Sequence, residues 1–77
     1  MSIKVLFFAS LREQLGQDHS EVAWQADLTA AQVWCLATGQ ARLPEQVLMA
    51  CNQEYCQGDS LIADGAEVAF FPPVTGG

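Results

Sequence analysis

Positively charged side chains are scarce in this sequence. Three lysine and arginine residues stand against nine aspartates and glutamates, which gives a formal net charge of −6 over 77 residues. Proteins that bind nucleic acids or anionic membrane surfaces rely on clustered lysine and arginine, so DNA, RNA and membranes are poor candidate partners. A basic face on another protein would suit this acidic chain better, because complementary charge speeds association.

Signals for disulfides and for membrane insertion are also weak. Cys35, Cys51 and Cys56 form an odd set, which argues against a disulfide framework and favours a reducing cytoplasm. The apolar run 5–9 is too short for a signal peptide, and the charge-free stretch 28–41 is shorter than the roughly 20 residues that span a bilayer. We therefore expect neither a targeting segment nor a membrane anchor.

Residues for self-contained catalysis are sparse as well. The single histidine, His19, follows Asp18 in a polar turn, where a solvated imidazole is the ordinary interpretation. It has no evident serine or cysteine nucleophile as a partner, and no glycine-rich loop precedes a helix. Cys51 and Cys56 have the four-residue gap of a plant-type ferredoxin, but Asp59 occupies the next ligand position and a fourth cysteine is missing. We expect no metal site.

The remaining pattern is one of short strands around one main helix. Strands are expected at 3–8, 20–24, 47–55 and 66–71, with a short edge piece at 61–62. Ser10–Glu13 and Thr29–Gln32 both match the capping box, in which a hydroxyl and a later Glu or Gln satisfy each other's backbone amides. The first box predicts one short helical turn ended by Gly16, and the second opens the main helix, ended by Gly39. This order predicts an α+β roll in which a mixed sheet wraps one helix.

The C-terminal segment is the most unusual feature. Pro72 and Pro73 terminate the last strand, because neither has an amide hydrogen for a neighbouring strand. The four residues that follow, Val74-Thr75-Gly76-Gly77, would reach about 13–14 Å beyond the prolines when extended. Glycine lacks a Cβ, so the last two residues could thread a narrow channel and present a bare carboxylate inside it. We expect one domain, 1–77, with a flexible tail, 72–77, that enters another protein's active site.

With these features the chain resembles the small, sulfur-carrying subunits of molybdopterin synthase, within the ubiquitin-like β-grasp proteins. The matching segments lie mainly near the two ends. They are Lys4-Val5-Leu6-Phe7-Phe8-Ala9 with Arg12-Glu13 and Gly16, then Asn52-Gln53-Glu54-Tyr55, Asp64-Gly65, and Glu67 through Gly77. The final eleven residues are the most specific part. The middle departs from the family, because the link 40–46 is compact and Cys51 and Cys56 replace the usual aliphatic residues.

The resemblance implies a sulfur carrier that is no enzyme on its own. Gly77 would be adenylated with ATP by an activating enzyme of the ubiquitin-activating type, and a sulfurtransferase would provide sulfur for a C-terminal thiocarboxylate. The tail would then enter the large catalytic subunit of molybdopterin synthase and donate sulfur to a cyclic pyranopterin phosphate. The carrier would bind no cofactor itself. Gly76 would give clearance, and the tail would be guided and seated by Phe71, Pro72, Pro73, Val74 and Thr75.

A binding surface follows if the first and last strands are neighbours, as in the β-grasp arrangement. The sheet face opposite the helix would then hold Leu6, Phe8, Ala69 and Phe71. We expect this apolar patch to dock the large subunit, with the acidic surround steering encounter; the alternative is that loops of the same chain cover it.

Two other functions stay open at this point. A related carrier could feed sulfur to thiamine or to another acceptor, and a ubiquitin-like modifier would join its terminal glycine to lysines of other proteins. The Phe-Phe-Pro-Pro-Val run before the glycines favours the molybdopterin branch by resemblance.

Overall fold

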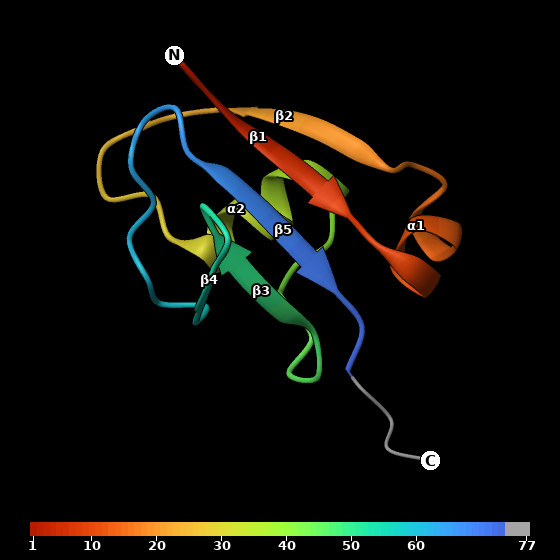
Figure 1. Cartoon of the computed structure of the whole chain (residues 1–77). Helices are drawn as coiled ribbons and strands as arrows, with labels where there is room; N and C mark the ends of the chain where they lie inside the picture. The colour runs from red at the N-terminus through yellow and green to blue at the C-terminus, as the bar shows by residue number, and fades with distance from the viewer. Residues whose placement is uncertain (74–77) are drawn as a thin grey trace.

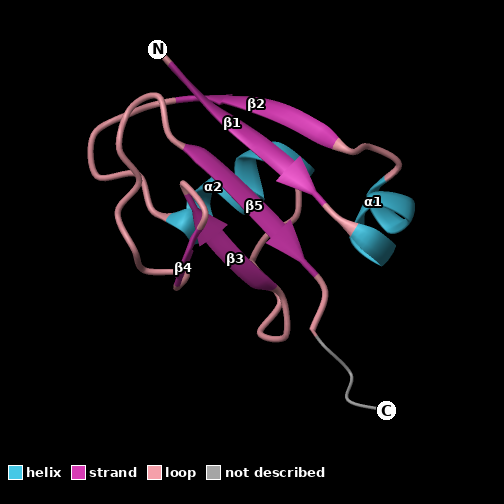
Figure 2. Cartoon of the chain, viewed as in Figure 1, coloured by secondary structure: helices cyan, strands magenta, loops and turns pink. Residues whose placement is uncertain are grey.

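Residues 1–73 of the computed structural model form a five-stranded sheet with two helices (Figures 1 and 2). Residues 74–77, which make up most of the expected tail, lie outside the described residues. No helix in the described range is long and apolar enough to cross a membrane. The elements in chain order are β1 (Ser2–Phe7), α1 (Ala9–Leu15), β2 (His19–Ala23), α2 (Ala30–Thr38), β3 (Leu48–Cys51), β4 (Glu54–Cys56) and β5 (Glu67–Phe71).

The sheet brings the first and last strands together at its centre. The strand order is β2-β1-β5-β3-β4, with β1 parallel to β5 and every other neighbouring pair antiparallel. The main helix α2 lies across one face of this sheet, behind it in the view of Figure 1. The expected α+β roll, with a mixed sheet around one main helix, is therefore confirmed.

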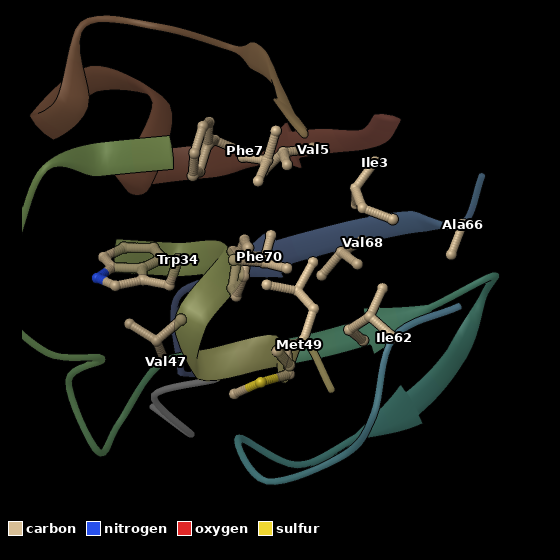
Figure 3. Close-up of a cluster of buried hydrophobic side chains, with 14 of the residues drawn as sticks. Ile3, Val5, Phe7, Trp34, Val47, Met49, Ile62, Ala66, Val68 and Phe70 are labelled. Atoms are coloured by element: carbon tan, nitrogen blue, oxygen red, sulfur yellow. The ribbon is translucent and has the colours of Figure 1, made fainter. Parts of the chain in front are cut away.

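The core lies between α2 and the inner face of the sheet, where three aromatic rings meet (Figure 3). Trp34 packs edge-on against both Phe7 and Phe70, with ring centroids 6.0 and 5.1 Å apart. Phe7 and Phe70, on the neighbouring strands β1 and β5, are stacked at 6.0 Å. All three side chains are buried. This packing fixes which face of β1 and β5 is turned away from the helix.

The main helix begins and ends as the sequence predicts. The Thr29 hydroxyl accepts a hydrogen bond from the Gln32 amide at 3.3 Å, and the Gln32 side-chain oxygen accepts from the Thr29 amide at 2.9 Å. Both halves of the capping box are thus present. Gly39 ends the helix with φ of 77°, a left-handed conformation that glycine adopts without the steric cost of a Cβ.

The short helix α1 begins differently from the prediction. Gly16 ends it in a left-handed conformation as expected, but the capping box predicted at Ser10–Glu13 is wrong. The N-cap is Phe8, without a side-chain hydrogen bond, and its carbonyl accepts from the Leu11 amide at 3.2 Å. Ala9 has a φ of 53°, so the chain turns sharply out of β1 and enters the helix one residue before Ser10. The serine is then inside the helix and cannot cap it.

The segment expected as one strand at 47–55 is a hairpin of two. β3 and β4 pair across a turn at Asn52 and Gln53, whose φ values are 50° and 71°. The Asn52 side-chain oxygen accepts from the Glu67 amide at 3.0 Å, and the Asn52 amide donates to the Glu67 carbonyl at 2.8 Å. These two bonds tie the turn to the start of β5. The last residues of the expected strand, 54–55, therefore belong to the edge strand β4.

Candidate functional site

The four residues predicted to share the outer sheet face do lie on it. In β1 the side chains of Ile3, Val5 and Phe7 are buried, which leaves Leu6 on the opposite face. In β5 the buried side chains are Val68 and Phe70, so Ala69 and Phe71 face outward. Leu6 lies directly opposite Ala69 in the parallel pairing of the two strands.

Phe8 extends this face just beyond β1. Its amide donates to the Phe70 carbonyl at 3.1 Å, which holds the backbone beside β5, and 46% of the residue remains exposed. Leu6, Ala69 and Phe71 are half-buried. In Figure 1 the outer face of β5 is turned to the viewer, and no described segment crosses in front of it. The alternative in which loops of the same chain cover the patch is thus not seen in residues 1–73.

Three residues of the hairpin enlarge this patch, and sequence reasoning did not place them there. Leu48 and Ala50 of β3 lie opposite Phe71 and Ala69, and Tyr55 of β4 lies opposite Ala50. Tyr55 is 79% exposed and packs edge-on against Phe71, with ring centroids 5.8 Å apart. Asn52 is the residue in the sequence that could have predicted this placement. Asparagine tolerates the left-handed backbone conformation that a tight hairpin turn requires. We call the complete set the docking face: Leu6, Phe8, Leu48, Ala50, Tyr55, Ala69 and Phe71.

Charged side chains border the docking face on β1, β2 and β5. Lys4 lies between Glu21 and Glu67 in the strand register, and His19 lies opposite Leu6. The His19 Nδ1 atom is 2.7 Å from a carboxylate oxygen of Asp18. The hydrogen bond with His19 is the main reason that the pKa of Asp18 is lowered from its usual value. The border is polar and mostly acidic, as expected for the rim of a protein-binding surface.

The expected tail begins beyond the docking face. Pro72 is half-buried and Pro73 is exposed, and both follow the last residue of β5. Of the other predicted tail residues, Val74, Thr75, Gly76 and Gly77 lie outside the described residues. The structure thus brings the docking face and the first two tail residues to adjoining positions on the molecule.

The three cysteines have structural positions. Each is a free thiol that packs partly buried against the core. Burial raises the pKa of Cys51 and of Cys56 above the usual value, with smaller contributions from Glu54 at Cys51 and from Cys51 at Cys56. A raised pKa leaves less of the nucleophilic thiolate at neutral pH. Among the described residues no group of three or more His, Cys, Asp or Glu side chains could hold a metal ion.

Comparison with known proteins gives matches over nearly the full chain. The sequence matches the ThiS family over residues 5–77. It is 44% identical to the "Molybdopterin synthase sulfur carrier subunit" of Escherichia coli and 36% identical to the protein of that name in Haemophilus influenzae. Each alignment covers 97% of this chain and 99% of the relative. The crystal structure of SAMP1 from Haloferax volcanii matches at a TM-score of 0.82 and 26% identity over all of both chains.

Proposed function

Because the chain belongs to the ThiS family, we propose that it is the sulfur carrier of a molybdopterin synthase and serves in molybdenum cofactor biosynthesis. The observation that carries this proposal is the likeness to two molybdopterin synthase sulfur carrier subunits along almost the whole length of each. In this role the carrier is not a catalyst on its own. It presents a reactive group, and its partners supply the acid–base residues and the substrate site.

The reactive group in this proposal is the C-terminal carboxyl of Gly77. A carboxylate is a poor electrophile, so an oxygen of Gly77 first attacks the α-phosphorus of ATP on an activating enzyme, and pyrophosphate leaves. Hydrosulfide, released from the persulfide of a sulfurtransferase by a thiol reductant, then attacks the carbonyl carbon, and AMP leaves. The resulting thiocarboxylate enters the large catalytic subunit and gives its sulfur to a cyclic pyranopterin phosphate. ATP is bound by the activating enzyme, and the carrier itself holds no cofactor.

The tail residues position the C-terminal group for this transfer. Pro72 and Pro73 restrict the backbone at the end of β5, since each ring fixes φ near −65°. They set the direction in which Val74, Thr75, Gly76 and Gly77 leave the domain. Gly76 gives clearance for a narrow channel, because it has no Cβ. The docking face seats the large subunit so that the tail meets its active site.

The state of the three cysteines also fits a reducing cytoplasm, which is where we place this reaction. All three cysteines are free thiols, and disulfides are rare in that compartment. Free thiols at partly buried positions with raised pKa values at Cys51 and Cys56 would not compete strongly with the C-terminal sulfur chemistry.

Adding one alanine after Gly77 tests the proposed function directly. The added residue moves the carboxylate away from the position that the activating enzyme reaches, so thiocarboxylate formation and sulfur transfer should both be lost while the fold survives. The control is an alanine added before Met1, at the other end of the chain. Circular dichroism checks the fold, and transfer is measured with the activating enzyme, the sulfurtransferase and the large subunit. An extended, untrimmed protein with normal transfer would contradict the proposal.

A ubiquitin-like modifier is the second candidate, favoured by the likeness to SAMP1, whose name stands for small archaeal modifier protein 1. A modifier would use the same adenylate, but a lysine amine of another protein would attack it and form an isopeptide bond. Both functions need a free Gly77, so the alanine extension does not separate them. Isolation of lysine conjugates from cells would support the modifier. A carrier for thiamine or another acceptor would instead fail to bind the large subunit.

A further inference from the structure

Tyr55 is the most exposed residue of the docking face, and it lies on a short edge strand. β4 has three residues, and β3 is its one neighbour in the sheet. Phe71 belongs to β5 on the far side of β3, so the Tyr55 ring must reach across β3 to make its edge-on contact. The position of this ring therefore depends on how the hairpin of β3 and β4 sits against β5.

The side chain of Asn52 extends the pairing of β3 with β5 into the hairpin turn. Ala50 lies opposite Ala69, and two residues further along the next equivalent pair is Asn52 with Glu67. A regular antiparallel pair of this kind exchanges two backbone hydrogen bonds. The Asn52 amide makes the first, to the Glu67 carbonyl at 2.8 Å. The second, from the Glu67 amide at 3.0 Å, is accepted by the side-chain oxygen of Asn52 in place of its backbone carbonyl.

This substitution occurs because the chain turns away from β5 at Asn52. Its φ is 50°, and that of Gln53 is 71°. Asparagine tolerates this left-handed conformation, whereas glutamine adopts it at a steric cost. Within residues 1–73, Asn52 is the turn residue that bonds to β5, and Gln53 makes no such bond. Asn52 thus fixes the direction in which the chain enters β4, three residues before Tyr55.

We propose that Asn52 is a positioning residue for the docking face. Its side-chain bond to Glu67 holds the hairpin so that the Tyr55 ring lies against Phe71, in the place where the large catalytic subunit binds it. The inference rests on the proposed function, because the large subunit is the partner. Asn52 itself acts through Tyr55 and is not a member of the docking face. A tyrosine that is already held in its bound position contributes more affinity, because less ordering is needed on binding.

A matched pair of glycine variants in the same turn tests this role. Asn52→Gly keeps the left-handed turn and the backbone donor, but it leaves the Glu67 amide without its side-chain acceptor. We expect the affinity for the large subunit to fall about three- to tenfold, the effect of one hydrogen bond. Gln53→Gly removes a side chain without removing a bond to β5, and should change affinity less than about twofold. Equal affinities for the two variants would overturn the proposal.

The same substitution in a Tyr55→Ala background separates positioning from a general loss of stability. If Asn52 acts through Tyr55, Asn52→Gly should change affinity less than about twofold once the ring is absent. Circular dichroism checks that each variant is folded. A loss of about three- to tenfold that persists without the ring would overturn the proposal, because Asn52 would then act on binding by another route.

A ¹⁹F signal from Tyr55 tests the positioning in the free chain. Labelling with 3-fluorotyrosine gives one resonance, because the chain has one tyrosine. In Asn52→Gly this resonance should move toward its position in a Phe71→Ala variant, where the ring has lost its neighbour, and in Gln53→Gly it should stay. An unchanged resonance in Asn52→Gly would refute the positioning role while leaving the sulfur-carrier proposal intact. A wild-type chain that fails to bind the large subunit would refute both.

Discussion

At the residue scale, two hydroxyl side chains near helix starts have different energetic roles. The Thr29 oxygen accepts from the Gln32 amide and completes a capping box, whereas Ser10 lies inside α1 and caps nothing. Removing a capping oxygen leaves one of the first helical amides without its partner. The stability of the two helices should therefore respond differently to the same chemical change.

Replacing each hydroxyl residue by alanine measures this difference. Thr29→Ala should lower the free energy of unfolding by about 0.5–2 kcal/mol. Ser10→Ala should leave it unchanged or raise it by a few tenths of a kcal/mol, since alanine is the better helix former in a helix interior. Urea unfolding followed by circular dichroism gives both values. An equal loss in the two variants would show that Ser10 is a cap after all.

At the scale of elements, the alternation of side chains in β1 and β5 could be predicted from the sequence. Apolar residues at every position of 3–8 except Lys4 predict a strand with two apolar faces, and alternation in the last strand predicts Val68 and Phe70 on one side, where both are buried. That these strands are neighbours is a long-range pairing, which the local sequence does not encode. It came from the family resemblance and is confirmed by the parallel register.

Two errors at this scale have local physical causes. The hairpin turn has both central residues at positive φ, but its second residue is Gln53, where glycine is the usual signal. Without that signal, 47–55 looked like one strand, and Tyr55 was missed as part of the docking face. The early start of α1 depends on a left-handed alanine, Ala9, which is uncommon and leaves no trace in the sequence pattern. The roles of residues 74–77 stay predictions.

The docking face can be tested with three single aspartate variants. Tyr55→Asp and Phe71→Asp place a charge within the apolar surface, and we expect each to weaken binding of the large subunit about tenfold or more. Leu36→Asp is the control, because Leu36 is also an exposed apolar residue, at 57%, but belongs to α2, which covers the inner face of the sheet. Pulldown or titration calorimetry measures binding, and circular dichroism checks each fold. Equal binding by all three variants would exclude the face.

At the scale of the whole molecule, net charge governs the encounter with partners. The chain carries −6, and acidic side chains border the docking face. We expect the association rate with the large subunit to fall as salt rises from about 0.05 to 0.5 M, because screening shortens the range of attraction. The dissociation rate should change much less, since apolar contacts hold the complex. Stopped-flow measurements give both rates. An association rate that is independent of salt would contradict electrostatic steering.

The sulfur-carrier function requires that sulfur is carried at the C-terminal carboxyl of Gly77. Intact-mass spectrometry of the chain, isolated after reaction with its activating enzyme, ATP and a sulfurtransferase, tests this most directly. We predict a mass gain equal to the difference between one sulfur and one oxygen atom, located at Gly77 by fragmentation. Sulfur found instead on Cys35, Cys51 or Cys56, as an added atom of a persulfide, would contradict the account.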